Sequence, residues 1–259
     1  MPVKKRIVAT LFWSVIAAAF IGPGTLVTAS VAGSRYGLDL LWTLAFATIA
    51  CIIFQEMAAR LTLVTGKDLA ATFGRYRLKW LISIIPFSVI LGCVAYEAGN
   101  LQGAAIGLDM LFPELSNYSF LIVGVGAIIL LLVSSFKRLV YILGELVALM
   151  GIAFLIITIR IAPPIDEILE ALFVPGIPEG SDWLVLGLIG TTVVPYNLFL
   201  GSGISKDTTI GLMRFGLVTS IILGGLISAS ILITGTLMQG SEGLQDLVEV
   251  ARSELGYVW

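Results

Sequence analysis

Apolar residues along this chain come in long runs, and polar or charged segments separate these runs. An α-helix needs about 20 apolar residues to cross the hydrocarbon core of a bilayer. Runs of this kind lie at residues 8–30, 40–62, 80–112, 117–136, 139–160, 183–203 and 211–238. The pattern therefore predicts an all-α polytopic membrane protein with about seven spans, of which the third is long and has a polar middle.

The composition agrees with this prediction and narrows the class of protein. Hydrophobic residues make up 58% of the 259 residues and charged residues 12%, which is too apolar for a soluble domain. The net charge of -2 gives no argument for nucleic acid as a partner, so the expected environment is the lipid bilayer. The chain has no histidine, which removes the commonest proton shuttle and transition-metal ligand.

Sequence motifs for catalysis or ATP hydrolysis are also missing. No GxxxxGK[ST] loop occurs, and no pair of catalytic side chains lies at mid-membrane spacing. We therefore expect neither an ATP-driven pump nor an intramembrane enzyme, and no cofactor.

The basic residues are distributed unevenly between the two sides of the membrane. If the spans alternate in direction, only Arg35, Arg160 and Arg252 fall on one side. The other side has Lys4, Lys5, Arg6, Arg60, Lys67, Arg75, Arg77, Lys79, Lys137, Arg138, Lys206 and Arg214. Because positive residues concentrate in the cytoplasm, this predicts a cytoplasmic N-terminus. The short tails and the absence of a targeting segment favour a bacterial inner membrane.

Two spans contain helix-breaking residues at matching depth. In the first, Gly22, Pro23 and Gly24 come about 13 residues after the span begins; in the sixth, Pro195 comes about 12 residues after Trp183. The sixth span starts on the opposite face of the membrane, because an odd number of spans precedes it. Interrupted helices at corresponding positions of two inverted halves are the best sequence indication of a transporter's substrate site.

The breaks free polar backbone groups at a depth where lipid offers no hydrogen bonds. Proline removes a backbone donor, and non-helical backbone at this depth persists only where it lines an enclosed cavity. Either proline alone would more simply produce a kink. The matched pair, together with the adjacent polar side chains of Thr25, Thr191, Thr192 and Asn197, favours a cation site instead.

Four segments resemble, in order and spacing, the first, second, third and sixth spans of the NRAMP family of divalent-metal transporters. They read "GPGTLVTASVAGSRYGLDLLW", "QEMAARLTLVTGKDLA", "AYEAGNLQGAAIGLDMLF" and "GTTVVPYNLFLGS". The resemblance covers nearly the whole chain. It implies the LeuT-type fold, in which two inverted repeats of five helices form a metal site where helices one and six unwind.

This resemblance also implies a division of the chain. Residues 1–160 would form the first repeat, and residues 161–182 an external loop with a short amphipathic helix at "IDEILEALF". Residues 183–259 would begin the second repeat with spans six and seven, so we expect a truncated sequence. A non-functional fragment is therefore one alternative reading of the chain.

The departures from the family pattern concern the metal site itself. The family's Asp-Pro-Gly-Asn is replaced here by Gly22, Pro23, Gly24 and Thr25, and its Met-Pro-His by Val194, Pro195 and Tyr196. In the third span, a family aspartate aligns with Glu97 and a family glutamate with Asn100. These replacements remove the acidic and thioether ligands and leave oxygen groups, which suit hard ions.

The changed residues resemble those of the NRAMP-related magnesium transporters, a branch without the usual proton coupling. By this resemblance the substrate is a divalent cation, Mg²⁺ or Mn²⁺, and a channel or uniporter is the alternative. We predict that Thr25, Asn197 and the free carbonyls of Gly22 and Thr191 surround the ion. Val194 and Tyr196 would shape the cavity.

Charged and sulfur-containing side chains elsewhere in the spans allow further predictions. Glu97 and Asn100 are candidates for the ion pathway, although Glu97 could instead make a structural hydrogen bond to a neighbouring span. Glu56 and Arg60 have the spacing at which opposite charges pair on one helix face. Cys51 and Cys93 are expected to be small core residues.

Overall fold

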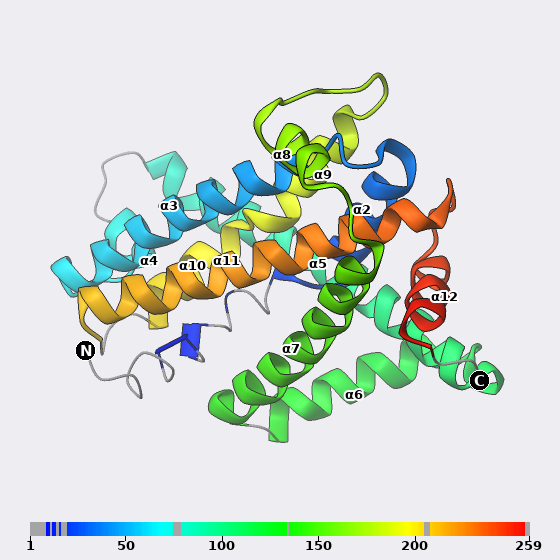
Figure 1. Cartoon of the computed structure of the whole chain (residues 1–259). Coiled ribbons are helices and arrows are strands. Elements are labelled where there is room, and N and C mark those ends of the chain that lie inside the picture. Colours follow the sequence, from blue (N-terminus) through cyan, green and yellow to red (C-terminus); the bar gives the residue numbers. More distant parts are fainter. Residues whose placement is uncertain are drawn as a thin grey trace.

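The computed structural model describes residues 9, 10, 12, 13, 16, 20–74, 79–133, 135–204 and 208–256 (Figure 1). The described parts are helical with no β-strand, so the all-α prediction is confirmed. The helices are α2 Pro23–Tyr36, α3 Leu41–Thr65, α4 Leu69–Phe73, α5 Lys79–Leu111, α6 Ser119–Val133, α7 Phe136–Ile161, α8 Ile165–Phe173, α9 Asp182–Thr192, α10 Pro195–Ile204, α11 Ile210–Gly235 and α12 Leu244–Leu255. Two short 3₁₀ helices, Pro113–Leu115 and Thr236–Met238, follow α5 and α11.

Five segments within the described ranges are long and apolar enough to cross a membrane. They are Leu41–Thr65, Ser83–Leu111, Ile142–Ile161, Asp182–Ile204 and Ile210–Met238. The predicted fourth span is the shorter helix α6, which has 15 residues. The predicted first span lies partly outside the described residues, and its second half is α2, which continues beyond residue 30 to Tyr36.

At the centre of the structure α11 packs against both α2 and α3, and small residues lie where α11 meets α2 (Figure 1). A Cβ atom built on Gly33 of α2 would lie 1.9 Å from the carbonyl oxygen of Leu232 in α11. One built on Gly235 of α11 would lie 2.2 Å from the carbonyl oxygen of Ser30. The two backbones are therefore in direct contact, as small residues allow in membrane helices.

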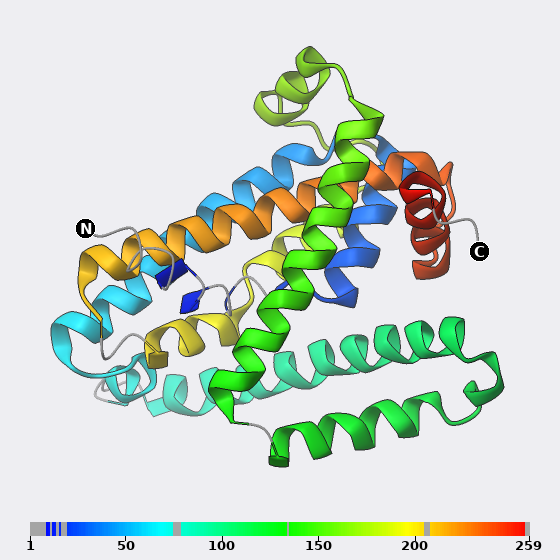
Figure 2. The ribbon, with the colours of Figure 1, turned by 60° about the horizontal axis from the view of Figure 1, so that its bottom comes forward.

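Figure 2 shows α5 and α6 as a long helix pair along one side of the molecule, with α7 running from the end of α6 across the front of the other helices. The last side chains of α6, such as Leu132 at 81% exposure, point away from the described protein, as suits contact with lipid. Of the two cysteines, Cys51 is buried as predicted, but Cys93 is exposed on α5. The prediction for Cys93 was wrong because other helices cover α5 over only part of its surface.

A charged cluster joins α3 to α11 at the end of the bundle where α11 begins. Arg60 Nη2 lies 2.6 Å from Glu56 Oε2, which confirms the predicted pair. Arg214 Nε of α11 lies 2.6 Å from the other carboxylate oxygen of Glu56. One carboxylate therefore holds two arginines that would otherwise repel each other.

Replacing Glu56 by glutamine is expected to lower the free energy of unfolding by about 1 kcal/mol, because both arginines are partly exposed and solvent screens the pairs. The measurement is thermal unfolding of the detergent-solubilised chain at low and high salt. The loss should shrink in high salt. Glu114→Gln, on the exposed 3₁₀ helix after α5, is the control and should change nothing. An equal effect of the two substitutions would contradict the prediction.

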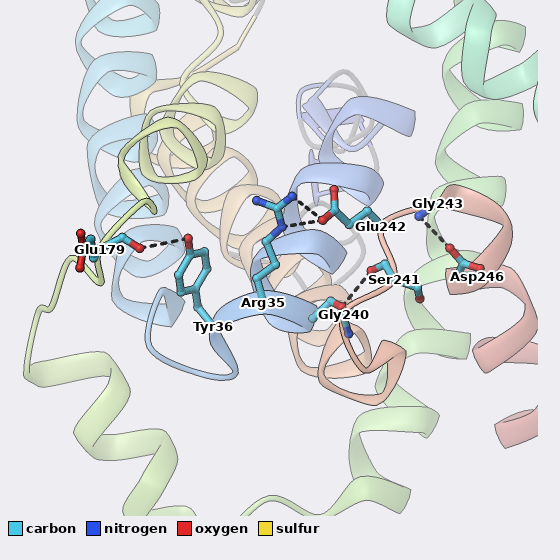
Figure 3. A network of polar contacts seen from close by, with 9 residues as sticks. Arg35, Tyr36, Glu179, Gly240, Ser241, Glu242, Gly243 and Asp246 are labelled. Atoms are coloured by element: carbon cyan, nitrogen blue, oxygen red, sulfur yellow. Dashed lines mark hydrogen bonds and ion pairs between the residues drawn. The ribbon is translucent and has the colours of Figure 1, made fainter.

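Figure 3 shows a second polar network at the opposite end, where α2 ends. Arg35 pairs with Glu242 in the connection between α11 and α12, and Ser34 Oγ donates to the carbonyl of Ser241 over 2.8 Å. Tyr36 Oη donates to the carbonyl of Glu179, 3.4 Å away, before α9. The second half of the broken first span is thus fixed at its far end to the segment before α9 and to the segment between α11 and α12.

The amphipathic segment predicted after the fifth span forms α8, nine residues long and bracketed by prolines. The described arginines also separate as the span prediction requires, with Arg60 and Arg214 at one end of the bundle and Arg35 and Arg160 at the other. Lys4, Lys5, Arg6, Arg75, Arg77 and Lys206 lie outside the described residues. Which end faces the cytoplasm stays a prediction.

Candidate functional site

Both predicted helix breaks are present, and each follows from local backbone chemistry. In the first span the helical residue Phe20 is followed by non-helical Ile21 and Gly22, and α2 begins at Pro23. Proline suits the first position of a helix, where its missing N–H would have had no helical partner. In the sixth span α9 ends at Thr192 and α10 begins at Pro195. The unwinding of helices one and six is therefore confirmed.

The two breaks meet at the side chain of Tyr96, which comes from α5. Tyr96 Oη donates to the carbonyl oxygen of Phe20, 2.8 Å away, and lies 3.5 Å from the carbonyl oxygen of Thr191. One hydroxyl group therefore contacts the last turn before each break. The Phe20 carbonyl also accepts a hydrogen bond from Thr25 Oγ1, so oxygen atoms from three helical segments converge at this point.

The side chains that the sequence singled out are mostly buried at the breaks. Thr25 and Asn197 are fully buried, and Val194 is 5% exposed. The hydroxyl of Thr191 bonds within its own helix to the Leu188 carbonyl, so it is the Thr191 carbonyl that faces Tyr96. Tyr196 packs edge-on against Tyr96, with ring centroids 5.6 Å apart. Its role in shaping a cavity, like that of Val194, stays a prediction.

Asn197 is the buried polar side chain at the breaks with the fewest hydrogen-bond partners among the described residues. Neither its Oδ1 nor its Nδ2 has a hydrogen-bond partner among the described residues, although the side chain is fully buried. A buried amide without partners costs free energy, and a ligand could supply what is missing. This observation makes Asn197 the strongest candidate ligand on α10.

One predicted detail, that the Gly22 carbonyl is free, was wrong, whereas the role of Gly22 as a ligand stays a prediction. The Gly22 carbonyl is not free, because it accepts the backbone N–H of Leu26 over 3.0 Å and is the first acceptor of α2. Gly22 is the N-cap of that helix, and the carbonyl of an N-cap residue normally accepts the first intrahelical bond. The carbonyl that Tyr96 links to the second break belongs to Phe20, two residues earlier.

The sequence did not predict that α5 packs beside the two breaks and forms part of the site. Tyr96, Asn100 and Gly103 lie on one face of α5, at the spacing that places side chains above one another. Gly103 lets this face approach α2 closely, since a Cβ atom built on it would lie 2.1 Å from Pro23 Cβ. The available signal was a tyrosine within an apolar run, whose hydroxyl needs a partner when buried.

Glu97 differs in position from the other polar residues of α5. It is exposed in the described structure, and Asn100 Nδ2 donates to its Oε2 over 3.4 Å. This partner lies on the same helix, so among the described residues no bond from Glu97 to a neighbouring span is found. Its role in an ion pathway stays a prediction.

A cavity of about 370 Å³ leads from the first break toward the network of Figure 3. Its lining includes Pro23, Gly24, Thr28 and Gln102, and at the outer end Glu242. A larger cavity of about 900 Å³ lies beside α8 and is lined by neither break. The smaller cavity could therefore give an ion access to the site from the side of the first break. A third cavity, of about 290 Å³, reaches Pro195 of the second break, but its other lining residues are nearly all apolar.

The chemistry available at the breaks is that of neutral oxygen atoms. The described residues contain no group of three or more His, Cys, Asp and Glu side chains that could hold a metal ion. Carbonyl, hydroxyl and amide oxygens suit hard cations, which often keep part of their hydration shell.

Comparison with known proteins gives consistent results. The sequence model of the family described as Natural resistance-associated macrophage protein-like (Nramp) matches residues 14–253. Metal transporter Nramp3 of Oryza sativa is 34% identical over 192 residues, covering 73% of this chain and 35% of the relative. The divalent metal cation transporter MntH of Bacillus subtilis is 29% identical over 262 residues, covering 94% of this chain and 61% of the relative.

A solved structure has the same fold. The manganese transporter of Eremococcus coleocola superposes with a TM-score of 0.73 at 22% identity, covering 95% of this chain and 58% of that protein. This likeness confirms the predicted LeuT-type fold, which is incomplete in this chain. The chain spans only about a third to three fifths of the length of these relatives.

Proposed function

We propose that this chain, which belongs to the Nramp family, binds a divalent metal cation between its two broken helices and moves that ion across a membrane. It would act as a secondary transporter or facilitator. The relatives named above are described as transporters of metals, of divalent metal cations and of manganese. No enzymatic step is part of this proposal.

The observation that supports the proposal most is the convergence of oxygen atoms at Tyr96. The carbonyls of Phe20 and Thr191 come from different repeats of the fold and lie within 2.8 and 3.5 Å of one hydroxyl oxygen. Unwound backbone at the repeat interface is where such transporters coordinate cations. The Phe20 carbonyl accepts hydrogen bonds from both Tyr96 and Thr25 and so holds this point together. The ligand oxygens would be those of Thr25 and Asn197 and the carbonyl of Thr191.

We further propose that the ion is Mg²⁺ or Mn²⁺ and that the chain belongs to the magnesium-transporting branch. The positions of acidic and thioether ligands hold Gly22 and Val194, so the site lacks the soft donor that favours transition metals. Magnesium dehydrates reluctantly and commonly keeps several waters. A site of neutral oxygens beside a cavity of about 370 Å³ suits an ion that enters partly hydrated.

Transport without proton coupling is also part of the proposal. The chain has no histidine, and Asn100 is neutral at a site where an acid would be needed to carry a proton. The proposed location is a bacterial inner membrane with the N-terminus in the cytoplasm, because basic residues dominate the side that holds Arg60 and Arg214.

The test is ion uptake into proteoliposomes that contain the purified chain. A magnesium-sensitive dye inside the vesicles should report saturable uptake of Mg²⁺, and a pH-sensitive dye should report no accompanying acidification. Manganese uptake without a magnesium signal would overturn the magnesium assignment. Acidification in step with uptake would overturn the uncoupled mechanism, and flux that does not saturate would indicate a channel.

A further inference from the structure

We propose that Asn100 of α5 supplies a cation ligand, through its Oδ1, in the space that a side chain at position 22 would occupy. This inference rests on the proposed function. It assigns to α5 a ligand that the family pattern Asp-Pro-Gly-Asn would place at position 22, on the break of the first span. Three features of the structure support it: the position of Oδ1, the orientation of the amide, and its lack of a partner.

The position of Oδ1 is defined by its distance to Gly22. A Cβ atom built on Gly22 would lie 2.8 Å from Asn100 Oδ1 and 3.8 Å from its Cγ. These separations are too short for a side chain at position 22 and the Asn100 amide to occupy their places together. The amide oxygen therefore reaches the first break because residue 22 has no side chain.

Glu97 determines which end of the Asn100 amide faces the break. The atom of the Asn100 amide that lies 3.4 Å from Glu97 Oε2 is the donating Nδ2. The oxygen must then point the other way, toward Gly22. Glu97 is thus a positioning residue for Asn100.

Among the described residues, the Asn100 oxygen has no hydrogen-bond donor. Its Oδ1 is buried from solvent and without a partner in the part of the chain that the structure describes. Buried polar atoms normally have a partner, and an unpaired acceptor is costly. A cation, or a water molecule in its hydration shell, would satisfy this oxygen, and amide oxygens are ordinary ligands of hard divalent ions.

The close contact between α5 and α2 keeps this oxygen in place. Gly103 lies one turn after Asn100, and its contact with Pro23 fixes the backbone of α5 beside the break. A ligand on a packed helix is held more firmly than one on a loop. Asn100 could therefore keep its geometry while the unwound segment of the first span adjusts.

The experiment compares cation binding by the purified chain and its variants in lipid nanodiscs, by calorimetric titration with MgCl₂ and MnCl₂. Asn100→Leu removes the oxygen at nearly constant volume and should weaken binding of both ions by about tenfold or more, the scale of losses around metal sites. Asn100→Asp keeps an oxygen there, adds a charge and should strengthen binding. Asn117→Leu, the same replacement in the exposed turn before α6, is the control and should bind normally.

A double substitution tests whether positions 22 and 100 share one ligand space. Gly22→Asp alone should disturb the site, because its Cβ atom meets Asn100 Oδ1. In an Asn100→Ala background the same aspartate has room and should bind Mn²⁺ more tightly than the Gly22→Asp chain does. If the effects of Gly22→Asp and Asn100→Ala on the binding free energy are strictly additive, positions 22 and 100 do not share one ligand space.

The outcomes distinguish this inference from the proposed function. If the unmodified chain binds neither ion, both the proposed function and the assignment of Asn100 are wrong. If it binds Mg²⁺ or Mn²⁺ and a folded Asn100→Leu chain binds equally well, the assignment of Asn100 falls and the proposed function stands. Retained helicity by circular dichroism identifies the folded variants.

Discussion

Replacing Gly33 by alanine is expected to destabilise the chain by about 3 kcal/mol, at the upper end of what overpacking costs. The added Cβ atom would lie 1.9 Å from the carbonyl oxygen of Leu232 and 2.9 Å from its carbonyl carbon. Both atoms belong to the backbone of α11, so no side chain can rotate away to make room. The helices would have to separate, and close packing is what joins helices in a bilayer.

The matched control for this prediction is Gly107→Ala in α5, where a Cβ atom would meet nothing within 4 Å. Alanine is the better helix former, so this variant should be as stable as the unmodified chain or slightly more stable. Thermal unfolding of both variants in one detergent, followed by circular dichroism, is the measurement. Equal melting temperatures would show that α2 and α11 are not in backbone contact.

Separation of these two helices would also affect the candidate site. Pro23 at the break and Gly33 at the contact lie on the same short helix, and α2 is tied to the α11–α12 connection through Arg35 and Glu242. A shift of α2 away from α11 would therefore move Thr25 and Gly22 relative to Tyr96. The Gly33→Ala variant should accordingly lose cation binding as well as stability.

The sequence predicted the two breaks because they depend on local chemistry. Proline cannot donate a backbone hydrogen bond, which favours a break at Pro23 and at Pro195. Proline alone does not decide this, because Pro86 lies inside the continuous helix α5; the polar residues beside Pro23 and Pro195 supplied the rest of the signal. The length of the apolar runs then placed both breaks at matching depth. The Glu56–Arg60 pair was predictable for the same reason, since both partners lie on one helix face and the distance was fixed by their spacing.

The identity of the ligands was less predictable, because it depends on how separate helices are rotated against one another. Sequence position alone does not indicate that Tyr96 bonds to the Phe20 carbonyl, while the Gly22 carbonyl accepts a bond within α2. The contributions of Tyr96 and Asn100 likewise require knowing which face of α5 meets α2. That rotation is set by the contact between Gly103 and Pro23, which the sequence does not reveal.

Asn197→Leu is expected to stabilise the unliganded chain while weakening its binding of cations. Both polar atoms of Asn197 are buried and lack partners within the described residues, so the amide is an unsatisfied group that leucine of similar volume would remove. Unsatisfied buried groups cost about 1–3 kcal/mol, and the free energy of unfolding should rise by an amount in this range. Affinity for Mg²⁺ and Mn²⁺ should fall by about tenfold or more.

The opposite signs of these two effects separate a binding role for Asn197 from a structural one. Thr192→Val is the matched control, because its buried hydroxyl is already bonded to the Leu188 carbonyl over 2.9 Å beside the same break. That variant should lose about 1 kcal/mol of stability and bind cations normally. If Asn197→Leu instead lowers the melting temperature of the ion-free chain, the amide holds the fold together. Stability without bound ion would then be its function, and α10 would contribute no side-chain ligand.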